Sequence, residues 1–196
     1  HLRTAGGVEL VRQARQDLFG RAAVTAEVSP HHLLLTEDAC ARYDPNTKMN
    51  PPLRTRGDID ALLEGVRDGT ITVLATDHAP HTPEEKELEF AAAPYGIVGL
   101  DCALPLYVQA LVETGTLGWP DLIAMMTRHP ATLCGLVGLG TLAPGSHGDV
   151  TLIDPQASWV IDPEDFASKA RNCPFAGRRV TGRALGTVVA GRTVFS

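Results

Sequence analysis

The sequence has few aromatic residues and no excess of basic charge. Aromatic side chains make up 5% of the 196 residues, and 17 Lys and Arg stand against 23 Asp and Glu, for a formal net charge of -6. A chain of this charge lacks the electrostatic footprint of a protein that binds nucleic acid or an anionic membrane surface. We therefore expect no nucleic-acid or membrane partner. Its 44% hydrophobic residues are typical of a globular protein rather than a disordered one.

Long apolar runs and paired cysteines are also lacking. No stretch approaches the roughly 20 apolar residues of a membrane span, and the opening residues 1–7 do not resemble a signal peptide. The four cysteines form no CxxC pair, so we expect reduced thiols and a cytoplasmic protein. The chain does not begin with Met, and a helical pattern starts almost at once. We expect a fragment, with a missing amino-terminal part of the same protein as its partner.

Helical and strand-like segments alternate in the first part of the chain. Apolar residues at helical spacing predict a helix over 8–18 that stops at Gly20, followed by a strand over 22–28. A second helix is expected to begin with Asp58 as its N-cap and to lead into a strand over 71–75. This alternation is typical of α/β folds with a parallel sheet or barrel, in which functional residues follow the carboxyl ends of strands.

The remainder of the chain changes character after Gly140. A helical pattern is expected over 100–113, and another helix opens at Trp119 with Pro120 in its first turn. Short β-rich runs follow, divided by Gly, Pro and Asp, at 150–153, 158–161 and 186–190. These runs predict a small β module at the end of the chain.

Asp77, His78 and His81 form the densest group of chemically active side chains, directly after an apolar strand. A carboxylate in that place can bind a metal and carry a proton, and imidazoles can bind metal or donate hydrogen bonds to an anion. Asp77 could equally cap the turn that follows the strand.

Two other loops hold polar side chains of interest. Lys48–Arg54 contains Asn50 beside two prolines, which stiffen the loop. His31 and His32 follow the first predicted strand. Because adjacent strand residues point to opposite faces, both imidazoles cannot easily reach one ion, and we expect them to be hydrogen-bonded structural histidines.

Several motifs in one order resemble the dihydroorotases of the amidohydrolase superfamily. They are KMNPPLR at Lys48–Arg54, ATDHAPH at Ala75–His81, and PYGIVG at Pro94–Gly99, where Tyr95 replaces the more usual Phe. Further segments that resemble this family are 29–35, 148–154 and 172–177. The resemblance covers nearly the whole chain.

This resemblance implies an α/β fold that is the carboxyl-terminal part of a metal-dependent (β/α)8 TIM barrel, plus a small β-sandwich module. Residues 1–138 would form the last strands and helices of the barrel, and residues 139–196 the β module without its amino-terminal strands. The expected cofactor is Zn²⁺, with one or two ions per site.

The resemblance also assigns the site residues. His1 and Asp77 match metal ligands of the family, although Arg3 departs from the small residue usual two positions after that histidine. Asp77 also matches the general acid/base. The residues that match positions holding the substrate are Asn50, His81, Tyr95 and Gly96.

The implied activity is the reversible hydrolysis of the cyclic amide of dihydroorotate to N-carbamoyl-aspartate in pyrimidine biosynthesis. The remaining metal ligands of the family would lie upstream of His1, so the 196 residues alone are expected to be inactive and poorly folded. The family also leads us to expect a homo-oligomer and allows an aspartate transcarbamoylase partner.

Two alternatives stay open. Another cyclic amidohydrolase, such as an allantoinase or a dihydropyrimidinase (hydantoinase), would share the barrel, the metals and the aspartate at position 77. A non-catalytic dihydroorotase-like scaffold of aspartate transcarbamoylase is a different class of protein. Such scaffolds typically lose metal ligands, whereas Asp77 and His81 are both present here.

Overall fold

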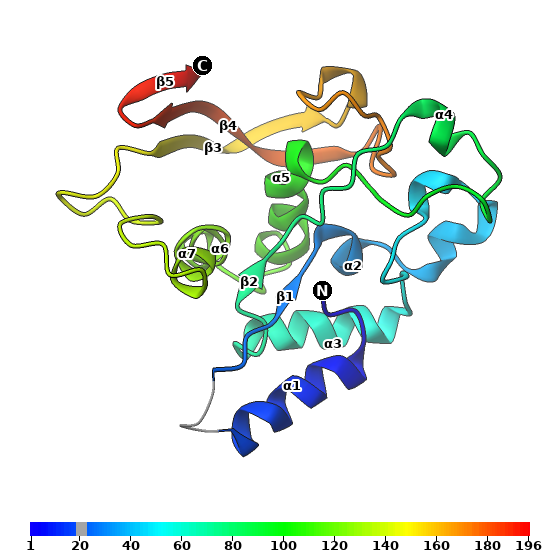
Figure 1. Ribbon diagram of the computed structural model, residues 1–196, viewed down its shortest axis with the longest axis horizontal. Helices are drawn as coiled ribbons and strands as arrows, with labels where there is room; N and C mark the ends of the chain where they lie inside the picture. The colour runs from blue at the N-terminus through cyan, green and yellow to red at the C-terminus, as the bar shows by residue number, and fades with distance from the viewer. Residues whose placement is uncertain (19–22) are drawn as a thin grey trace.

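The computed structural model describes residues 1–18 and 23–196, with two parallel strands near the centre and an antiparallel sheet at one end (Figure 1). The α-helices are α1 (Ala5–Asp17), α2 (Pro30–Leu34), α3 (Arg56–Arg67), α4 (Pro83–Lys86), α5 (Ala103–Tyr107), α6 (Trp119–Met126) and α7 (Arg128–Leu133). Other helical turns are η1 (Glu37–Arg42), η2 (Pro45–Thr47), η3 (Leu100–Cys102), η4 (Val108–Val112) and η5 (Pro163–Asp165). The strands are β1 (Glu27–Val28), β2 (Val73–Leu74), β3 (Val150–Val160), β4 (Arg179–Val189) and β5 (Arg192–Phe195).

Strands β1 and β2 pair in parallel, as the alternation of helices and strands predicts. Glu27 lies opposite Val73, and Val28 lies opposite Leu74. Both strands are shorter than expected, and the start of the first predicted strand, Ala22, lies outside the described residues. Helix α3 supplies the crossover that a parallel pair requires.

The helix predicted from Asp58 begins earlier than expected. Thr55 is the N-cap of α3, and its hydroxyl accepts a hydrogen bond from Asp58 N, while the Asp58 carboxylate accepts one from Thr55 N. This is a capping box, in which an acidic residue three positions after the cap satisfies the cap's own N–H. The assignment of Asp58 as the N-cap was therefore wrong. The expected helix stop at Gly20 lies outside the described residues.

The later helices agree with the sequence pattern. The segment 100–113 is helical through η3, α5 and η4, and α6 begins at Trp119 with Pro120 in its first turn. Within the described residues, no helix is both long enough and apolar enough to cross a membrane.

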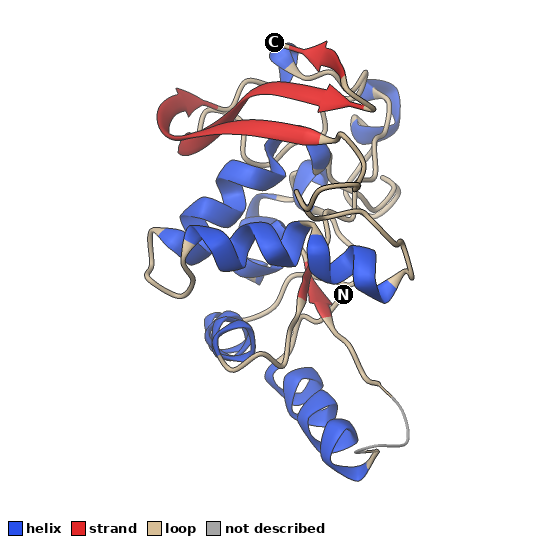
Figure 2. Cartoon of the chain, turned by 90° about the vertical axis from the view of Figure 1, so that its left-hand side faces the viewer, coloured by secondary structure: helices blue, strands red, loops and turns tan. Residues whose placement is uncertain are grey.

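A three-stranded antiparallel sheet in the order β3-β4-β5 lies beyond the helices (Figure 2). The run predicted at 150–153 and residues 158–160 of the next run belong to one strand, β3, because bulges let the chain continue between them. Residues 186–189 of the last predicted run form the end of β4, and β5 was not expected. The β-rich character of the final segment is confirmed.

Two apolar clusters hold the described residues together. The first surrounds β1 and β2 and includes Val28, Leu62, Leu74 and Tyr107. The second joins residues 98–106 to residues 161–180. Its members are Val98, Cys102, Leu106, Ile161, Phe166, Ala170, Cys173, Phe175 and Val180. The second cluster therefore ties the loops that follow β2 to the β-rich part of the chain.

Tyr107 joins the carboxyl ends of the two parallel strands. It is fully buried, and its hydroxyl lies 2.7 Å from Val28 O and 2.6 Å from Ala75 O. Burial, with Glu27 nearby, raises the pKa of Tyr107 well above its ordinary value, so the hydroxyl stays a proton donor. Because each strand has only two paired residues, this hydroxyl helps to fix where the next residues of both segments begin.

We expect Tyr107→Phe to lower the free energy of unfolding by about 1–3 kcal/mol, because both carbonyl groups lose the buried donor between them. Tyr43→Phe is the matched control, since Tyr43 is 73% exposed. Urea denaturation of the complete protein measures both. Equal stability of the Tyr107 variant and the wild type would contradict the role given to this hydroxyl.

Candidate active site

Asp77 follows β2 in an unusual backbone conformation. Its φ is +50°, in the left-handed region that few residues other than Gly adopt. Its side chain is 25% exposed, and the Oδ2 atom is buried without a hydrogen-bond partner among the described residues. A buried carboxylate oxygen without a donor is unfavourable for stability, and such strained, unsatisfied groups cluster at functional sites.

His1 lies directly beside Asp77. Its Nδ1 is 2.9 Å from Glu27 Oε1, and its Nε2 is 3.4 Å from Asp77 Oδ1. In a neutral imidazole, a proton on Nδ1 that is donated to Glu27 leaves a lone pair on Nε2. That lone pair then faces a carboxylate oxygen, an arrangement that a cation between them would stabilise.

The donor set of His1 and Asp77 therefore fits a divalent metal of the zinc type, which takes imidazole nitrogen and carboxylate oxygen. It is incomplete within residues 1–18 and 23–196, where no group of three or more His, Cys, Asp or Glu residues is placed to hold an ion. A structural or catalytic zinc site needs at least three protein ligands.

His31 and His32 lie in α2 rather than at the end of an extended strand, so the alternation argument made for them was based on the wrong element. Both are 2% exposed and bond the hydroxyl of Ser29, through His31 Nε2 at 2.8 Å and His32 Nδ1 at 2.7 Å. Both histidines are thus hydrogen-bonded, as expected. His31 Nε2 also lies 3.9 Å from Asp77 Oδ2, a contact that the sequence argument missed.

The hydrogen bonds of these histidines assign their tautomers. Burial lowers the pKa of both imidazoles, that of His31 strongly, so both are neutral at neutral pH. His32 Nε2 must donate to Pro51 O at 3.0 Å, which makes its Nδ1 the acceptor of the Ser29 proton. Ser29 Oγ then accepts from His31 Nε2. This network links β1 to the loop that contains Asn50.

His81, Tyr95 and Gly96 lie close together in the structure. His81 Nε2 donates to Tyr95 O at 2.8 Å, and His81 Nδ1 lies 3.3 Å from Glu85 Oε2. His78 has a different place, since its Nδ1 accepts from Gly99 N at 3.1 Å and Leu100 N at 3.2 Å. Asn50 is exposed and precedes Pro51 across a cis peptide bond.

Asn172 is a buried residue that holds this part of the site together. Its Nδ2 donates to Ala79 O at 2.9 Å and to Gly96 O at 3.0 Å, and its Oδ1 accepts from His81 N at 3.2 Å. Residue-based reasoning gave Asn172 no role. These bonds join residues more than 70 positions apart, which no local spacing indicates.

Comparisons with known proteins point to one family. The amidohydrolase family matches residues 24–194. The dihydroorotase of Pelotomaculum thermopropionicum is 50% identical over 194 residues, which are 99% of this chain and 44% of that protein. The dihydroorotase of Syntrophotalea carbinolica is 49% identical over 195 residues, 100% of this chain and 45% of that protein.

Solved structures show the same architecture. The L-hydantoinase (dihydropyrimidinase) from Arthrobacter aurescens has a TM-score of 0.91 and 33% identity, over 100% of this chain and 44% of that one. The D-hydantoinase (dihydropyrimidinase) from Thermus sp. has a TM-score of 0.91 and 25% identity, over 100% and 43%. The chain therefore spans less than half the length of the relatives it matches. The expected fold class, part of a TIM-barrel amidohydrolase, is confirmed.

We expect Gly96→Ala to disturb the contact between His81 and Tyr95. Gly96 has a φ of +145°, and an added Cβ would lie 2.6 Å from Ala79 Cβ and 2.9 Å from His81 Nε2. The expected loss is about 1–3 kcal/mol in the free energy of unfolding. In Gly57→Ala, the control, the added Cβ meets nothing closer than 3.9 Å, so urea denaturation should show unchanged or raised stability.

Proposed function

The chain belongs to the amidohydrolase family, and we propose that it forms the carboxyl-terminal part of a dihydroorotase. The enzyme would hydrolyse the cyclic amide of dihydroorotate to N-carbamoyl-aspartate, and reverse that reaction, in pyrimidine biosynthesis. The curated dihydroorotases named above support this choice of substrate, at 49–50% identity over nearly all of the chain. The observation that carries the chemistry is the Asp77 carboxylate, in which one oxygen has no partner among the described residues and the other faces His1 Nε2.

We propose His1 and Asp77 as metal ligands, with Zn²⁺ as the metal and one or two ions in the complete site. Their nitrogen and carboxylate donors suit that ion. Glu27 would orient the His1 ring through its Nδ1, as carboxylates beside ligating histidines commonly do. Bound zinc would supply Lewis acidity for the carbonyl group and lower the pKa of a water at the site.

Asp77 would move the proton during ring opening. The oxygen of the attacking water forms a bond to the ring carbonyl carbon, and Asp77 accepts the proton that this water loses. When the bond between that carbon and the ring nitrogen breaks, Asp77 returns the proton to the nitrogen. The carboxylate is suited to both steps because no donor among the described residues occupies its Oδ2.

The other site residues would bind the substrate. His81, Asn50 and the backbone at Tyr95 and Gly96 would hold the ring and the carboxylate of dihydroorotate, since several donors directed at a carboxylate fix its orientation. In the structure the His81 ring bonds Tyr95 O. His81 therefore acts partly through the backbone of the neighbouring loop.

We further propose that the complete protein is cytoplasmic and homo-oligomeric, with a small-molecule substrate, and that an aspartate transcarbamoylase partner is compatible with this family. Residues 1–138 and 139–196 remain our proposed division into barrel and β module. The 196 residues alone should be inactive, because two ligands do not complete a zinc site.

The alternative with the best support is a hydantoinase or dihydropyrimidinase, because the solved structures with TM-scores of 0.91 have those names. Their identities of 25–33% are lower than those of the dihydroorotases. We expect the complete protein to hydrolyse dihydroorotate in preference to hydantoin, dihydrouracil or allantoin. Comparing kcat/KM for the four compounds tests this, and a preference for any of the last three would contradict it. Loss of all four activities would favour the scaffold.

Asp77→Asn in the complete protein should reduce kcat by at least about 100-fold, because the amide cannot carry the proton in both steps. Binding of dihydroorotate, measured by calorimetry, should change little, since the proposed substrate donors remain. Metal content is measured alongside, so that loss of the ion is not mistaken for loss of the base. Asp60→Asn, at an exposed residue of α3, is the control. Undiminished turnover by the Asp77 variant would remove this residue from catalysis.

A further inference from the structure

Buried lysines surround the loop that carries Tyr95 and Gly96. The sequence has only three lysines, and two of them, Lys48 and Lys86, are each 8% exposed. The third, Lys169, is exposed. Lysine is almost never fully buried without a partner, so two buried examples beside the proposed substrate site need a physical explanation.

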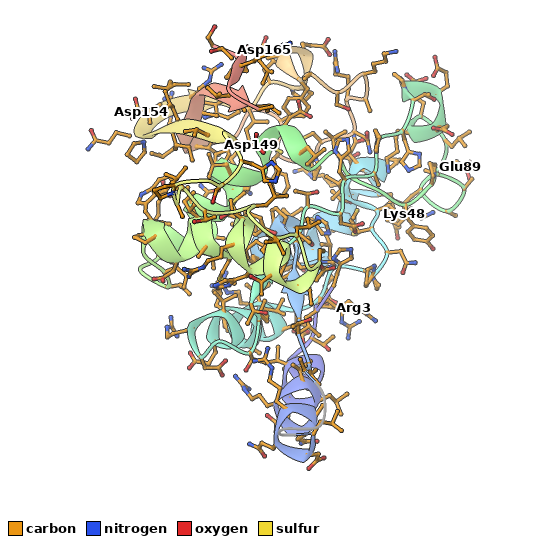
Figure 3. All side chains as sticks on the ribbon, turned by 60° about the vertical axis from the view of Figure 1, so that its left-hand side comes forward. Arg3, Lys48, Glu89, Asp149, Asp154 and Asp165 are labelled. Atoms are coloured by element: carbon orange, nitrogen blue, oxygen red, sulfur yellow. The ribbon has the colours of Figure 1, made fainter. Side chains whose placement is uncertain are left out.

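Lys48 binds backbone carbonyl groups of the loop 87–96. Its Nζ donates to Ala91 O at 2.9 Å and to Ala93 O at 2.6 Å. The same ammonium lies 4.6 Å from the ring centre of Tyr95 and 5.6 Å from that of Phe90, within the range of cation–π attraction. Figure 3 shows Lys48 on the same side of the molecule as Glu89, a residue of this loop.

Lys86 joins the end of the loop 87–96 to η2. Its Nζ donates to Pro94 O at 2.9 Å and to Pro45 O at 2.8 Å. Burial, together with the nearby charge of Lys48, lowers the pKa of Lys86 to about 8, and Asp44 opposes this change. The ammonium form therefore still predominates at neutral pH.

A backbone bond completes the attachment. Gly96 N donates to Lys48 O at 2.9 Å, so the loop 87–96 meets the segment 45–48 through two ammonium groups and one amide. A pocket of about 210 Å³ borders this attachment, and His81, Lys86 and Asn172 are among its lining residues. The attached loop is thus part of the surroundings of His81.

Stability alone does not account for these charges. Within the described residues, the ion pairs include neither Lys48 nor Lys86, whose hydrogen bonds go to neutral carbonyl groups. Taking a charge out of water without an anionic partner costs free energy. An ammonium does, however, offer three donors that can fix several carbonyl groups of an irregular loop at once.

We propose that Lys48 and Lys86 are positioning residues that hold the loop 87–96 in the shape with which its backbone at Tyr95 and Gly96 lies against the ring and carboxylate of the substrate. This inference rests on the proposed function.

The test compares Lys48→Met and Lys86→Met in the complete protein, with Lys169→Met as the matched control. The Lys48 and Lys86 variants, called the clamp variants below, should each raise KM for dihydroorotate about tenfold or more. Their kcat should change less than threefold, since the loop binds substrate and does not move the proton. The control should leave both constants unchanged. A fall in kcat with unchanged KM would overturn the proposal.

A second measurement does not depend on activity. Glu87 and Glu89 are exposed in the loop, and a glutamate-specific protease should cut there several-fold faster in the clamp variants than in the wild type or the control. Equal cleavage and equal KM in all four proteins would overturn the proposal. If the wild type does not hydrolyse dihydroorotate, the proposed function fails, and the cleavage rates still decide whether the lysines hold the loop.

Circular dichroism establishes that each variant is folded before these comparisons. Should a Met variant fail to fold, Lys86→Gln provides the comparison, because its amide keeps two N–H donors on a side chain one bond shorter and removes the charge. Its KM should then lie between those expected for the wild type and the Met variants. A KM equal to that of the wild type would show that the charge of Lys86 contributes nothing.

Discussion

The Tyr107 hydroxyl, between the carbonyl groups of Val28 and Ala75, is the contact on which the position of the site depends. Strands β1 and β2 pair over only two residues each, so the ladder alone fixes their ends weakly. The residues of chemical interest follow at once, with Ser29 after β1 and Asp77 three positions after β2. A small rotation between these two segments would separate His31 from Asp77, which now lie 3.9 Å apart.

Beyond the strands, side chains supply the hydrogen bonds that strand pairing supplies within a sheet. Irregular loops leave backbone carbonyl groups that must find donors if the loops are to be buried and ordered. Here Asn172 supplies donors to Ala79 O and Gly96 O, and His81 supplies one to Tyr95 O. Lys48 and Lys86 supply donors to four further carbonyl groups. The loops can therefore hold a defined shape without strand pairing along their length.

How well the sequence predicts this structure depends on how far apart in the chain the interacting residues lie. Helix periodicity and the placing of Asp77 after a strand are local, and both are confirmed. The start of α3 was misplaced because Thr55 and Asp58 are both good cap residues, and only the reciprocal bonds distinguish them. The roles of Asn172, Lys86 and His31 could not be predicted, since their partners are brought close only by the fold.

Charge is distributed unevenly across the site, and this distribution suits the proposed substrate. Asp77 and Glu27 place carboxylates around His1, which favours a cation at that end. Lys48 and Lys86 place ammonium groups behind the loop of Tyr95, where they bind neutral carbonyl groups and hold the backbone of the loop. Under the proposed function, the cleavable amide of the ring would lie at the His1 end and the rest of the ring beside the loop of Tyr95. Discrimination between dihydroorotate and hydantoin would then depend on the shape in which the lysines hold this loop, and not on their charge.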